Sequence, residues 1–269
     1  MIVDSCQRWR ARRDSYRPAG ELFEPRAFEV AAIESDRAAR AFVEAHHYSG
    51  SYPAARRRFG LFGRGELVGV AVFSVPMRAE VLRPWTMADG LELGRFVLLD
   101  GVRANGETWF LARCLEALKR EGFAGVVSLS DPTPRTSASG AVVFGGHVGT
   151  IYQASNAVYT GRASPQTLRL LPDGSVFSNR AASKIRKGER GWRYAVDQLV
   201  AHGAPEPRGD LYAWLREVVP MVTRPLRHHG NHRYLFGLSR AAKRALPASL
   251  AYPKLGARAA NDNTRRGAA

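Results

Sequence analysis

Charged side chains interrupt the strands that this sequence predicts at its centre. Glu92 and Arg95 fall inside a strand predicted over residues 92–99, and Asp131 follows a Val-rich strand predicted over 125–129. Asp131 or Glu92 could accept a proton, and Arg95 could stabilise a developing oxyanion. Strand alternation puts Glu92 and Arg95 on opposite faces, so they are not expected to pair. An aspartate after a strand also suits an ordinary turn, and this structural interpretation of Asp131 stays open.

Histidine and hydroxyl side chains add groups that exchange protons or hydrogen bonds. His47, Tyr48 and Ser49 end a helix predicted over residues 36–48. The helix dipole also favours a cationic histidine at that end, so a role in a site and a role in capping both remain open. His147 lies in a polar, glycine-rich stretch, which favours a functional role.

A metal site would have to combine ligands from distant segments. The candidates for an iron or zinc site are His46, His47, His147 and Asp131. No two of them have the spacing of ligands on one element, as HExxH has, and His46 faces the apolar side of its helix. The sequence therefore predicts no metal, and iron is kept as a minority alternative.

The turn after residue 99 is a candidate phosphate site. It leads through Asn105 and Gly106 into a helix predicted over 107–121, whose first N–H groups and positive dipole end suit an anion. Arg103 could add charge there. Asn-Gly before a helix is also an ordinary cap. No GxxxxGK[ST] or GxGxxG motif is present, which disfavours a nucleoside triphosphatase and a dinucleotide fold.

Composition indicates a soluble protein with a polyanionic partner. The 269 residues carry 40 Lys and Arg against 24 Asp and Glu, a net charge of +16, and 45% are hydrophobic. Two cysteines, Cys6 and Cys114, exclude a disulfide scaffold, and no apolar run is long enough to span a membrane, so we expect a cytoplasmic protein. Nucleic acid is the expected partner, with phosphate contacts from Arg56, Arg57, Arg58, Lys184, Arg186 and Lys187. A solvated edge is the alternative for the three arginines.

The order of elements predicts an α+β fold, a mixed sheet flanked by helices. The expected elements are a helix over 36–48, a hairpin over 59–62 and 67–74, strands over 92–99 and 125–129, a helix over 107–121, a short helix over 149–156, a hairpin over 167–178, helices within 180–219 and a strand over 233–238. We divide the chain into an N-terminal arm (1–30), a core (31–179), a helical segment with a final strand (180–255) and a flexible basic tail (256–269).

The central strand–helix–strand unit and the segment 151–161 resemble the GNAT N-acetyltransferase superfamily. The resemblance implies a largely antiparallel mixed sheet in which strands 92–99 and 125–129 diverge at their carboxyl ends and an acyl-CoA such as acetyl-CoA lies in the gap. It also implies that Tyr152 donates a proton to the leaving thiolate, although Tyr152 could instead pack against the sheet. The cofactor would then contact Phe96, Val97, Leu98, Arg103, Asn105, Gly106, Glu107 and Thr108.

A narrower resemblance spans residues 38–161 and, thinly, the C-terminal third. The motifs are HHYS at 46–49, PAARRRFG at 53–60, ELGR at 92–95, SDP at 130–132, GHVGTIYQASN at 146–156, HRY at 232–234 and YPK at 252–254. In this order they resemble the Mom family of phage DNA-modification proteins. The family implies conversion of adenine N6 in duplex DNA to a carbamoylmethyl derivative, in the bacterial host of a phage, as protection from restriction enzymes.

Base flipping would bring adenine into a pocket with a basic rim. The residues expected to form that pocket are Glu92, Arg95, Asp131, His147, Tyr152, His47, Tyr48 and Ser49. Two alternatives remain open: an N-acetyltransferase acting on a small-molecule or protein amine, and a basic DNA-binding protein without catalytic activity.

Overall fold

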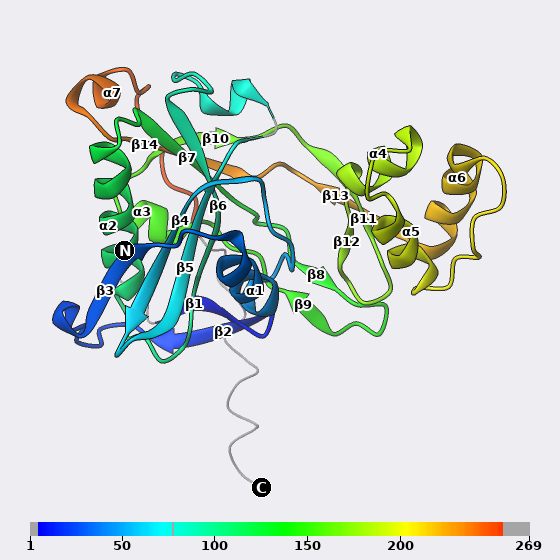
Figure 1. The fold of residues 1–269 in the computed structure, drawn as a ribbon, viewed down its shortest axis with the longest axis horizontal. Coiled ribbons are helices and arrows are strands. Elements are labelled where there is room, and N and C mark those ends of the chain that lie inside the picture. The colour runs from blue at the N-terminus through cyan, green and yellow to red at the C-terminus, as the bar shows by residue number, and fades with distance from the viewer. Residues whose placement is uncertain (1–4, 77, 255–269) are drawn as a thin grey trace, which may run out of the picture.

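A seven-stranded sheet forms the centre of the protein. The computed structural model describes residues 5–76 and 78–254 (Figure 1). The strand order is β10-β14-β7-β6-β5-β4-β3, and only β6 and β7 are parallel neighbours. The strands are β3 (Phe28–Ala32), β4 (Ala55–Gly63), β5 (Glu66–Ser74), β6 (Gly90–Leu98), β7 (Gly125–Ser130), β10 (Val158–Arg162) and β14 (His232–Gly237). The prediction of a mixed, largely antiparallel α+β sheet is confirmed.

Helices cover both faces of this sheet because its strands are apolar on both sides. Alternate residues of β5 enter two different clusters: Ala71 and Phe73 pack toward helix α2 (Gly106–Arg120), and Val70 and Val72 pack toward helix α1 (Asp36–His46). The apolar stripe of α2 is completely buried at Leu111, Cys114 and Leu118. A fully buried Leu contributes roughly 1.5–3 kcal/mol, so this stripe fixes α2 on the sheet. The short helices are α3 (Thr150–Ala154), α7 (Arg240–Arg244), η1 (Pro25–Ala27) and η2 (Ala79–Leu82).

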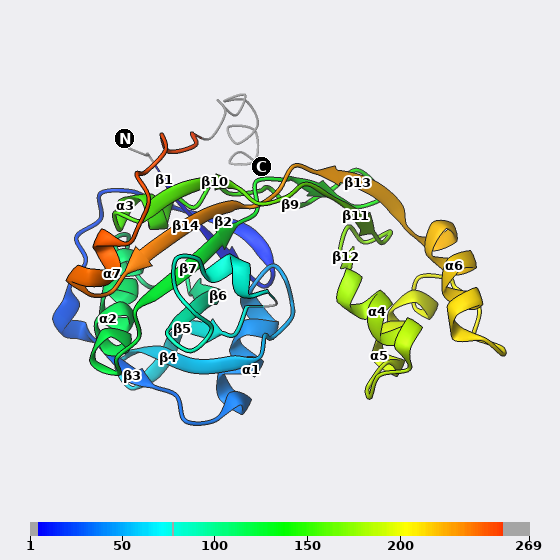
Figure 2. The same cartoon turned by 90° about the horizontal axis from the view of Figure 1, so that it is seen from above.

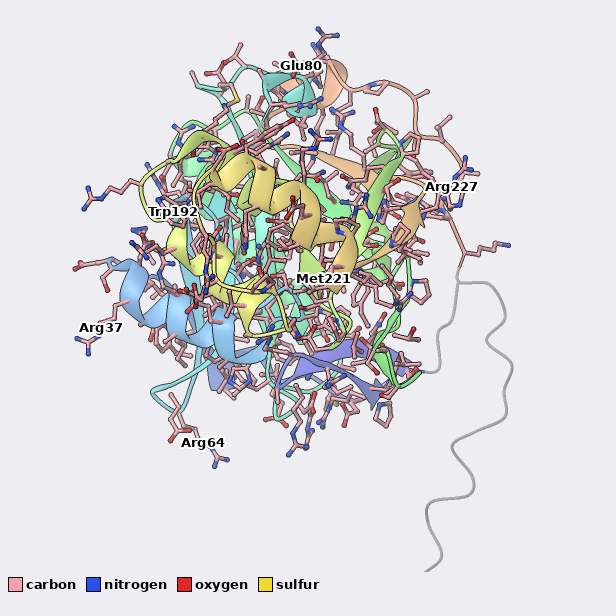
Figure 3. All side chains as sticks on the ribbon, turned by 90° about the vertical axis from the view of Figure 1, so that its right-hand side faces the viewer. Arg37, Arg64, Glu80, Trp192, Met221 and Arg227 are labelled. Carbon is pink, nitrogen blue, oxygen red and sulfur yellow. The ribbon has the colours of Figure 1, made fainter. Side chains whose placement is uncertain are left out.

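The C-terminal extension is a separate lobe with its own apolar core. A small sheet of β12 (Val176–Phe177), β11 (Gln166–Leu170) and β13 (Arg224–His228) leads from the main body to the helices α4 (Asn179–Lys187), α5 (Arg193–Val200) and α6 (Leu211–Val222). Figures 1 and 2 show this lobe at one end of the molecule, beyond the main sheet. Figure 3 looks onto it, with Trp192 and Met221 on its surface. The described residues contain no helix that is both long and apolar enough to cross a membrane.

The N-terminal arm contains strands that the sequence did not predict. It forms a hairpin of β1 (Ser5–Arg10) and β2 (Arg13–Pro18), closed by two residues with positive φ, Ala11 and Arg12. Strand β1 packs against β6, and β2 packs against the small hairpin of β8 (Arg135–Thr136) and β9 (Val142–Phe144). The arginine-rich sequences of β1 and β2 lack the apolar alternation that predicts strands, which explains why sequence reasoning missed them.

Strands β6 and β7 separate half-way along their length. They are paired from Gly90↔Gly125 to Leu93↔Ser128, while β6 continues to Leu98. The divergence expected from the resemblance is therefore present. Because β7 turns away, the β7-facing backbone edge of residues 94–98 has no strand partner in the described part of the chain, and a cavity opens there.

Candidate active site

The cavity between the diverging strands has a volume of about 320 Å³. Its walls come from strand β1, the end of α1, the second half of β6, the start of α2 and the loop that leads into α3. The sequence-predicted residues that line it are His47, Tyr48, Arg95, Phe96, Val97, Leu98, Asn105, Glu107, Thr108, His147 and Tyr152. Groups from segments more than 100 residues apart therefore meet in one place.

His47 presents a neutral imidazole to the cavity. It follows the last residue of α1 and is 5% exposed. Its Nδ1 accepts a hydrogen bond from the backbone N–H of Ser49 (3.2 Å) and lies 2.9 Å from the Ser49 hydroxyl. Since Nδ1 is an acceptor, the proton of the neutral ring is on Nε2. Burial, together with the charge of Arg95, holds the pKa of His47 well below its usual value. Ser49 thus positions His47 and does not line the cavity.

Aromatic rings form the wall beside His47. Tyr48 lies 4.3 Å from the His47 ring and 4.4 Å from Phe144, and Trp9 of β1 lies 4.5 Å from Tyr48 (centroid distances). His147 completes this group, with its ring 5.7 Å from Trp9. Burial raises the pKa of Tyr48. The wall thus consists of packed aromatic rings, and its polar groups are the phenol of Tyr48 and the imidazoles of His47 and His147.

His147 is the second neutral histidine of the cavity. Its backbone N–H donates to the Asp131 carbonyl (2.8 Å), which fixes the loop, while its Nε2 has no hydrogen-bond partner within the described residues. Burial, with smaller effects of His232 and Arg135, lowers its pKa to about 4. At neutral pH the His147 ring is therefore uncharged, and its Nε2 is buried.

Glu92 and Arg95 lie on the same face of β6, so our expectation of opposite faces is wrong. The reason is a bulge at Gly94. Glu92 pairs with Ser74 of β5 and Arg95 pairs with Val72, so β6 has two residues between these pairs where β5 has one. Both side chains are largely buried. Burial raises the pKa of Glu92 and lowers that of Arg95, and each charge opposes the shift of the other.

Arg95 reaches the cavity wall and Glu92 does not. The Arg95 guanidinium donates from Nε to the Ser51 carbonyl (2.7 Å) and from Nη2 to the Ser51 hydroxyl (2.8 Å). These bonds fix a positive charge beside His47 and Tyr48, where negative charge that develops on a substrate would be stabilised.

Tyr152 lies in α3, 5% exposed, with its ring 5.4 Å from Tyr234. Burial raises its pKa, so the phenol is protonated at neutral pH and can donate a proton or a hydrogen bond. Gln153 secures the loop before it by donating to the carbonyl of Val148 (3.1 Å) and the hydroxyl of Tyr234 (3.1 Å). The local geometry depends on Gly149, which precedes α3 with φ +73° and would bring a Cβ within 2.7 Å of the Tyr152 ring.

Asp131 does not line the cavity, and its oxygens are already engaged. It pairs with Arg135, accepts from His228 Nε2 (2.9 Å) and accepts from the backbone N–H of Thr133 (2.9 Å). The ion pair with Asp131 holds Arg135 in place, and the Arg135 guanidinium lies 4.3 Å over the ring of Phe144 in the aromatic wall. The structure thus gives Asp131 a positioning role behind the wall, in place of the expected base.

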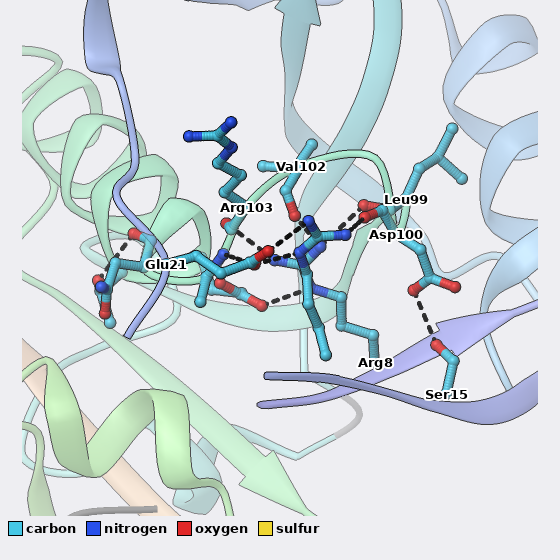
Figure 4. A network of polar contacts seen from close by, with 12 residues as sticks. Arg8, Ser15, Glu21, Leu99, Asp100, Val102 and Arg103 are labelled. Atoms are coloured by element: carbon cyan, nitrogen blue, oxygen red, sulfur yellow. Dashed lines mark hydrogen bonds and ion pairs between the residues drawn. The ribbon is translucent and has the colours of Figure 1, made fainter. Parts of the chain in front are cut away.

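The predicted phosphate turn is filled by side chains of this chain (Figure 4). The backbone N–H of Ala104 donates to Glu21 (3.0 Å). The guanidinium of Arg8, 3% exposed, donates to the carboxylate of Glu107 (2.6 Å) and to the carbonyls of Leu99 (3.0 Å), Val102 and Arg103 (3.1 Å). Arg103 itself points to the carbonyl of Leu22 (3.1 Å). The turn does not fit the diphosphate of an acyl-CoA.

The four residues considered as metal ligands do not form one group, because His47 and His147 line the cavity whereas His46 and Asp131 do not. Among residues 5–76 and 78–254 no three His, Cys, Asp or Glu side chains form a group that could hold a metal ion. His46 stacks on Phe42 with a centroid distance of 4.9 Å, and Asp131 is engaged as described above.

The arginines expected to contact DNA have partners within the protein. Arg57 pairs with Glu121, Arg58 pairs with Asp36 (3.0 Å), and Arg56 donates to the carbonyl of Met87 (3.0 Å). None of the three lines the cavity. Arg186 and Lys187, in contrast, are exposed in the last turn of α4, and Lys184 lies 5.2 Å over the ring of Tyr194.

Sequence reasoning missed Arg8 and Trp9, which line the cavity from the N-terminal hairpin. It also missed the residues that support the walls from behind, namely Glu21, Arg135, Phe144 and His228. A tryptophan between arginines in a segment without periodicity is the one signal that the sequence offered for β1.

A sequence model of the Mom protein family matches residues 27–254 of this chain. The chain belongs to the Mom protein family. The matched range contains the end of α1, β6, β7, α3 and the lobe. It therefore includes every segment that lines the cavity except the N-terminal hairpin β1–β2 and the residues that follow it directly. No curated protein sequence matches the chain.

Several solved structures are similar at low sequence identity. A tandem GNAT protein from the clavulanic acid biosynthesis pathway is 10% identical, with a TM-score of 0.42, 79% of this chain and 99% of that chain covered. An N-acetyltransferase from Staphylococcus aureus Mu50 is 12% identical, with a TM-score of 0.37 and the same coverage. The GNAT protein YhbS from Escherichia coli, solved with CoA, is 15% identical, with a TM-score of 0.31, 42% of this chain and 68% of that chain covered.

Proposed function

We propose that this protein is a DNA-modifying transferase that attaches a carbamoylmethyl-type group to N6 of adenine in duplex DNA. Membership of the Mom family supports this reaction class. The observation that carries the proposal is the convergence of His47, Tyr48, Arg95, His147 and Tyr152 on one enclosed cavity. A fold has no need to gather two neutral histidines, two phenols and a guanidinium beneath its surface, whereas catalysis at a flipped base does.

The protonation states suit attack by a weak nucleophile. The lone pair of adenine N6 is delocalised into the ring, so N6 must lose a proton as it gains the new bond to carbon. His147 is neutral at pH 7, and among the described residues its Nε2 has no hydrogen-bond partner, so in the tautomer with the hydrogen on Nδ1 this nitrogen can take that proton. The protonated Tyr152 can donate to the leaving group, and Arg95 with the Nε2–H of His47 can stabilise negative charge on the donor.

The aromatic wall suits a flipped base. Trp9 and Tyr48 present rings to the cavity, with Phe144 stacked on Tyr48 behind them, and base–aromatic stacking is worth about 1–3 kcal/mol per base. This gain offsets the few kcal/mol that are needed to unstack a base from duplex DNA.

The charge of the lobe supports a duplex DNA partner. Six of the seven charged residues between 180 and 193 are basic, whereas four of the six between 194 and 222 are acidic. Figures 1 and 2 place α4 on the side of the lobe toward the main body and α6 on the outer side. The helix of the basic half therefore lies on the side of the lobe nearer the body that contains the cavity, as expected if DNA phosphates lie along α4.

The test is mass spectrometry of nucleosides from the DNA of cells that express the full chain. We expect a modified adenine with wild-type protein and at least a hundred-fold less with Tyr152→Phe or His147→Gln, because general acid–base groups contribute about 10²–10⁴-fold. Tyr159→Phe is the matched control, since Tyr159 is buried outside the cavity and bonds His232 (2.8 Å).

Each remaining function class gives a different result. Unmodified DNA with wild-type protein that binds duplex DNA would indicate a binding protein without this activity. Unmodified DNA together with an acetylated amine would indicate an N-acetyltransferase. Equal loss with Tyr159→Phe and Tyr152→Phe would remove the cavity from the explanation.

A further inference from the structure

The turn between β6 and α2 is already satisfied by the protein's own charges. The backbone N–H of Ala104 donates to one carboxylate oxygen of Glu21, and Arg17 Nη2 donates to the other (2.6 Å). The bond to Arg17 and the Ala104 N–H together lower the pKa of Glu21, so it is a carboxylate at neutral pH. The place that an anionic ligand would take is therefore taken by a fixed anion.

Two further backbone N–H groups of this turn and three of its carbonyls are also engaged. The N–H groups of Val102 and Gly106 donate to the carbonyls of Leu99 (3.1 Å) and Arg103 (3.2 Å). The carbonyls of Leu99, Val102 and Arg103 point at the guanidinium of Arg8, as Figure 4 shows. Buried Glu107 in the first turn of α2 adds a second carboxylate, whose partner is the same guanidinium. A phosphate here would meet two carboxylates and would have to displace Arg8.

The cavity is also small for two substrates. Its volume of about 320 Å³ is at the lower end of the range for sites that hold one small ligand, about 300–1,000 Å³. It has to admit the reacting edge of a base as well as a donor. The open β7-facing backbone edge of residues 94–98 offers N–H and C=O groups to a short extended molecule.

We propose that the donor taken by this cavity carries no nucleotide diphosphate. It is a short molecule that lies along the free edge of β6, with the hairpin β1–β2 as its cover. That a donor exists rests on the proposed function, whereas the exclusion of a diphosphate from residues 99–108 rests on the Arg8, Glu21 and Glu107 contacts alone.

Hydrogen–deuterium exchange of the full chain tests the exclusion directly. Acetyl-CoA and free CoA are added at up to 1 mM, and exchange is followed over residues 5–18 and 99–108, with the β4–β5 hairpin as a check that the protein stays folded. We expect exchange over 99–108 to remain within error of the ligand-free protein. Saturable protection of 99–108 by either nucleotide, or loss of protection over 5–18 as the hairpin is displaced, overturns the proposal.

A second experiment addresses the donor itself. Duplex DNA and the protein are incubated with a small-molecule extract of bacterial cells, either untreated or digested with nucleotide pyrophosphatase, and modified adenine is measured. We expect equal modification with both extracts, and a loss of more than ten-fold after digestion overturns the proposal. If neither extract supports modification, the proposed function fails, and the exchange experiment still decides whether the turn takes a diphosphate.

Discussion

Replacing Arg8 by Ala should destabilise the protein far more than replacing an exposed arginine that is also ion-paired. The side chains of Arg8 and Glu107 are 2% and 6% exposed, and the Arg8 guanidinium satisfies one carboxylate and three carbonyls. Its removal leaves a buried carboxylate without a counter-charge, which costs about 3–5 kcal/mol. The small hairpin that Arg8 anchors would lose its attachment to the β6–α2 turn.

The matched control is Arg113→Ala. Arg113 pairs with Glu116 (2.8 Å) on the same helix, but the two side chains are 49% and 54% exposed, so the loss should be below about 1 kcal/mol. The free energy of unfolding is measured by urea titration at pH 7 for both variants. Arg8→Met combined with Glu107→Gln should recover much of the loss, since it removes both charges. A loss below 1 kcal/mol for Arg8→Ala would refute the buried-network argument.

Two further predictions follow from charge. Because His147 has a pKa of about 4 in the folded protein against about 6.5 when unfolded, the unfolded chain binds an extra proton between these values. The contribution of His147 to the free energy of unfolding should therefore fall by about 3 kcal/mol as the pH drops from 6.5 to 4. His147→Gln should reduce the total pH dependence, to which His232 with its pKa of about 4 also contributes, in urea titrations at several pH values. Replacing the exposed Arg186, Lys187 and Arg190 by Ala should reduce the slope of log K for duplex DNA against log salt by up to about 3. The control, Arg208→Ala with Arg216→Ala on the acidic side of the lobe, should leave that slope unchanged, and equal effects of both variants would contradict the assignment of the basic half.

The sequence predicted those parts of the fold in which one residue pattern decides the structure. The stripe of Leu111, Cys114 and Leu118 fixes α2, and the Gly-containing turn between β4 and β5 fixes a hairpin, as observed. The divergence of β6 and β7 was predicted through family resemblance, because no local pattern marks where two distant strands stop pairing.

What the sequence could not show depends on long-range contacts. The bulge at Gly94 reverses the side-chain alternation of β6 and brings Glu92 and Arg95 to one face, although nothing in ELGR signals an extra residue. The role of Asp131 was missed because its partner His228 is 97 residues away, and because nothing in the sequence indicates that its nearer partner Arg135 lies over the ring of Phe144. The contact of Arg8 with Glu107 holds strand β1 on the body of the protein. An arginine in a polar segment gives no sign in the sequence that it will be buried.

The hairpin β1–β2 also determines when the cavity can exist as the chain folds. Arg8 and Glu107 are 99 residues apart, and the Gln7 side chain donates to the carbonyl of Gly146 over 139 residues. Closure of such long loops follows the local helices and hairpins, because its entropy cost precedes any gain from contacts. On a ribosome that adds about 5–20 residues per second, strand β1 waits roughly 7–28 s for Gly146 to be synthesised. The hairpin β1–β2 thus reaches its final place long after it is made, and the cavity has its complete wall only then.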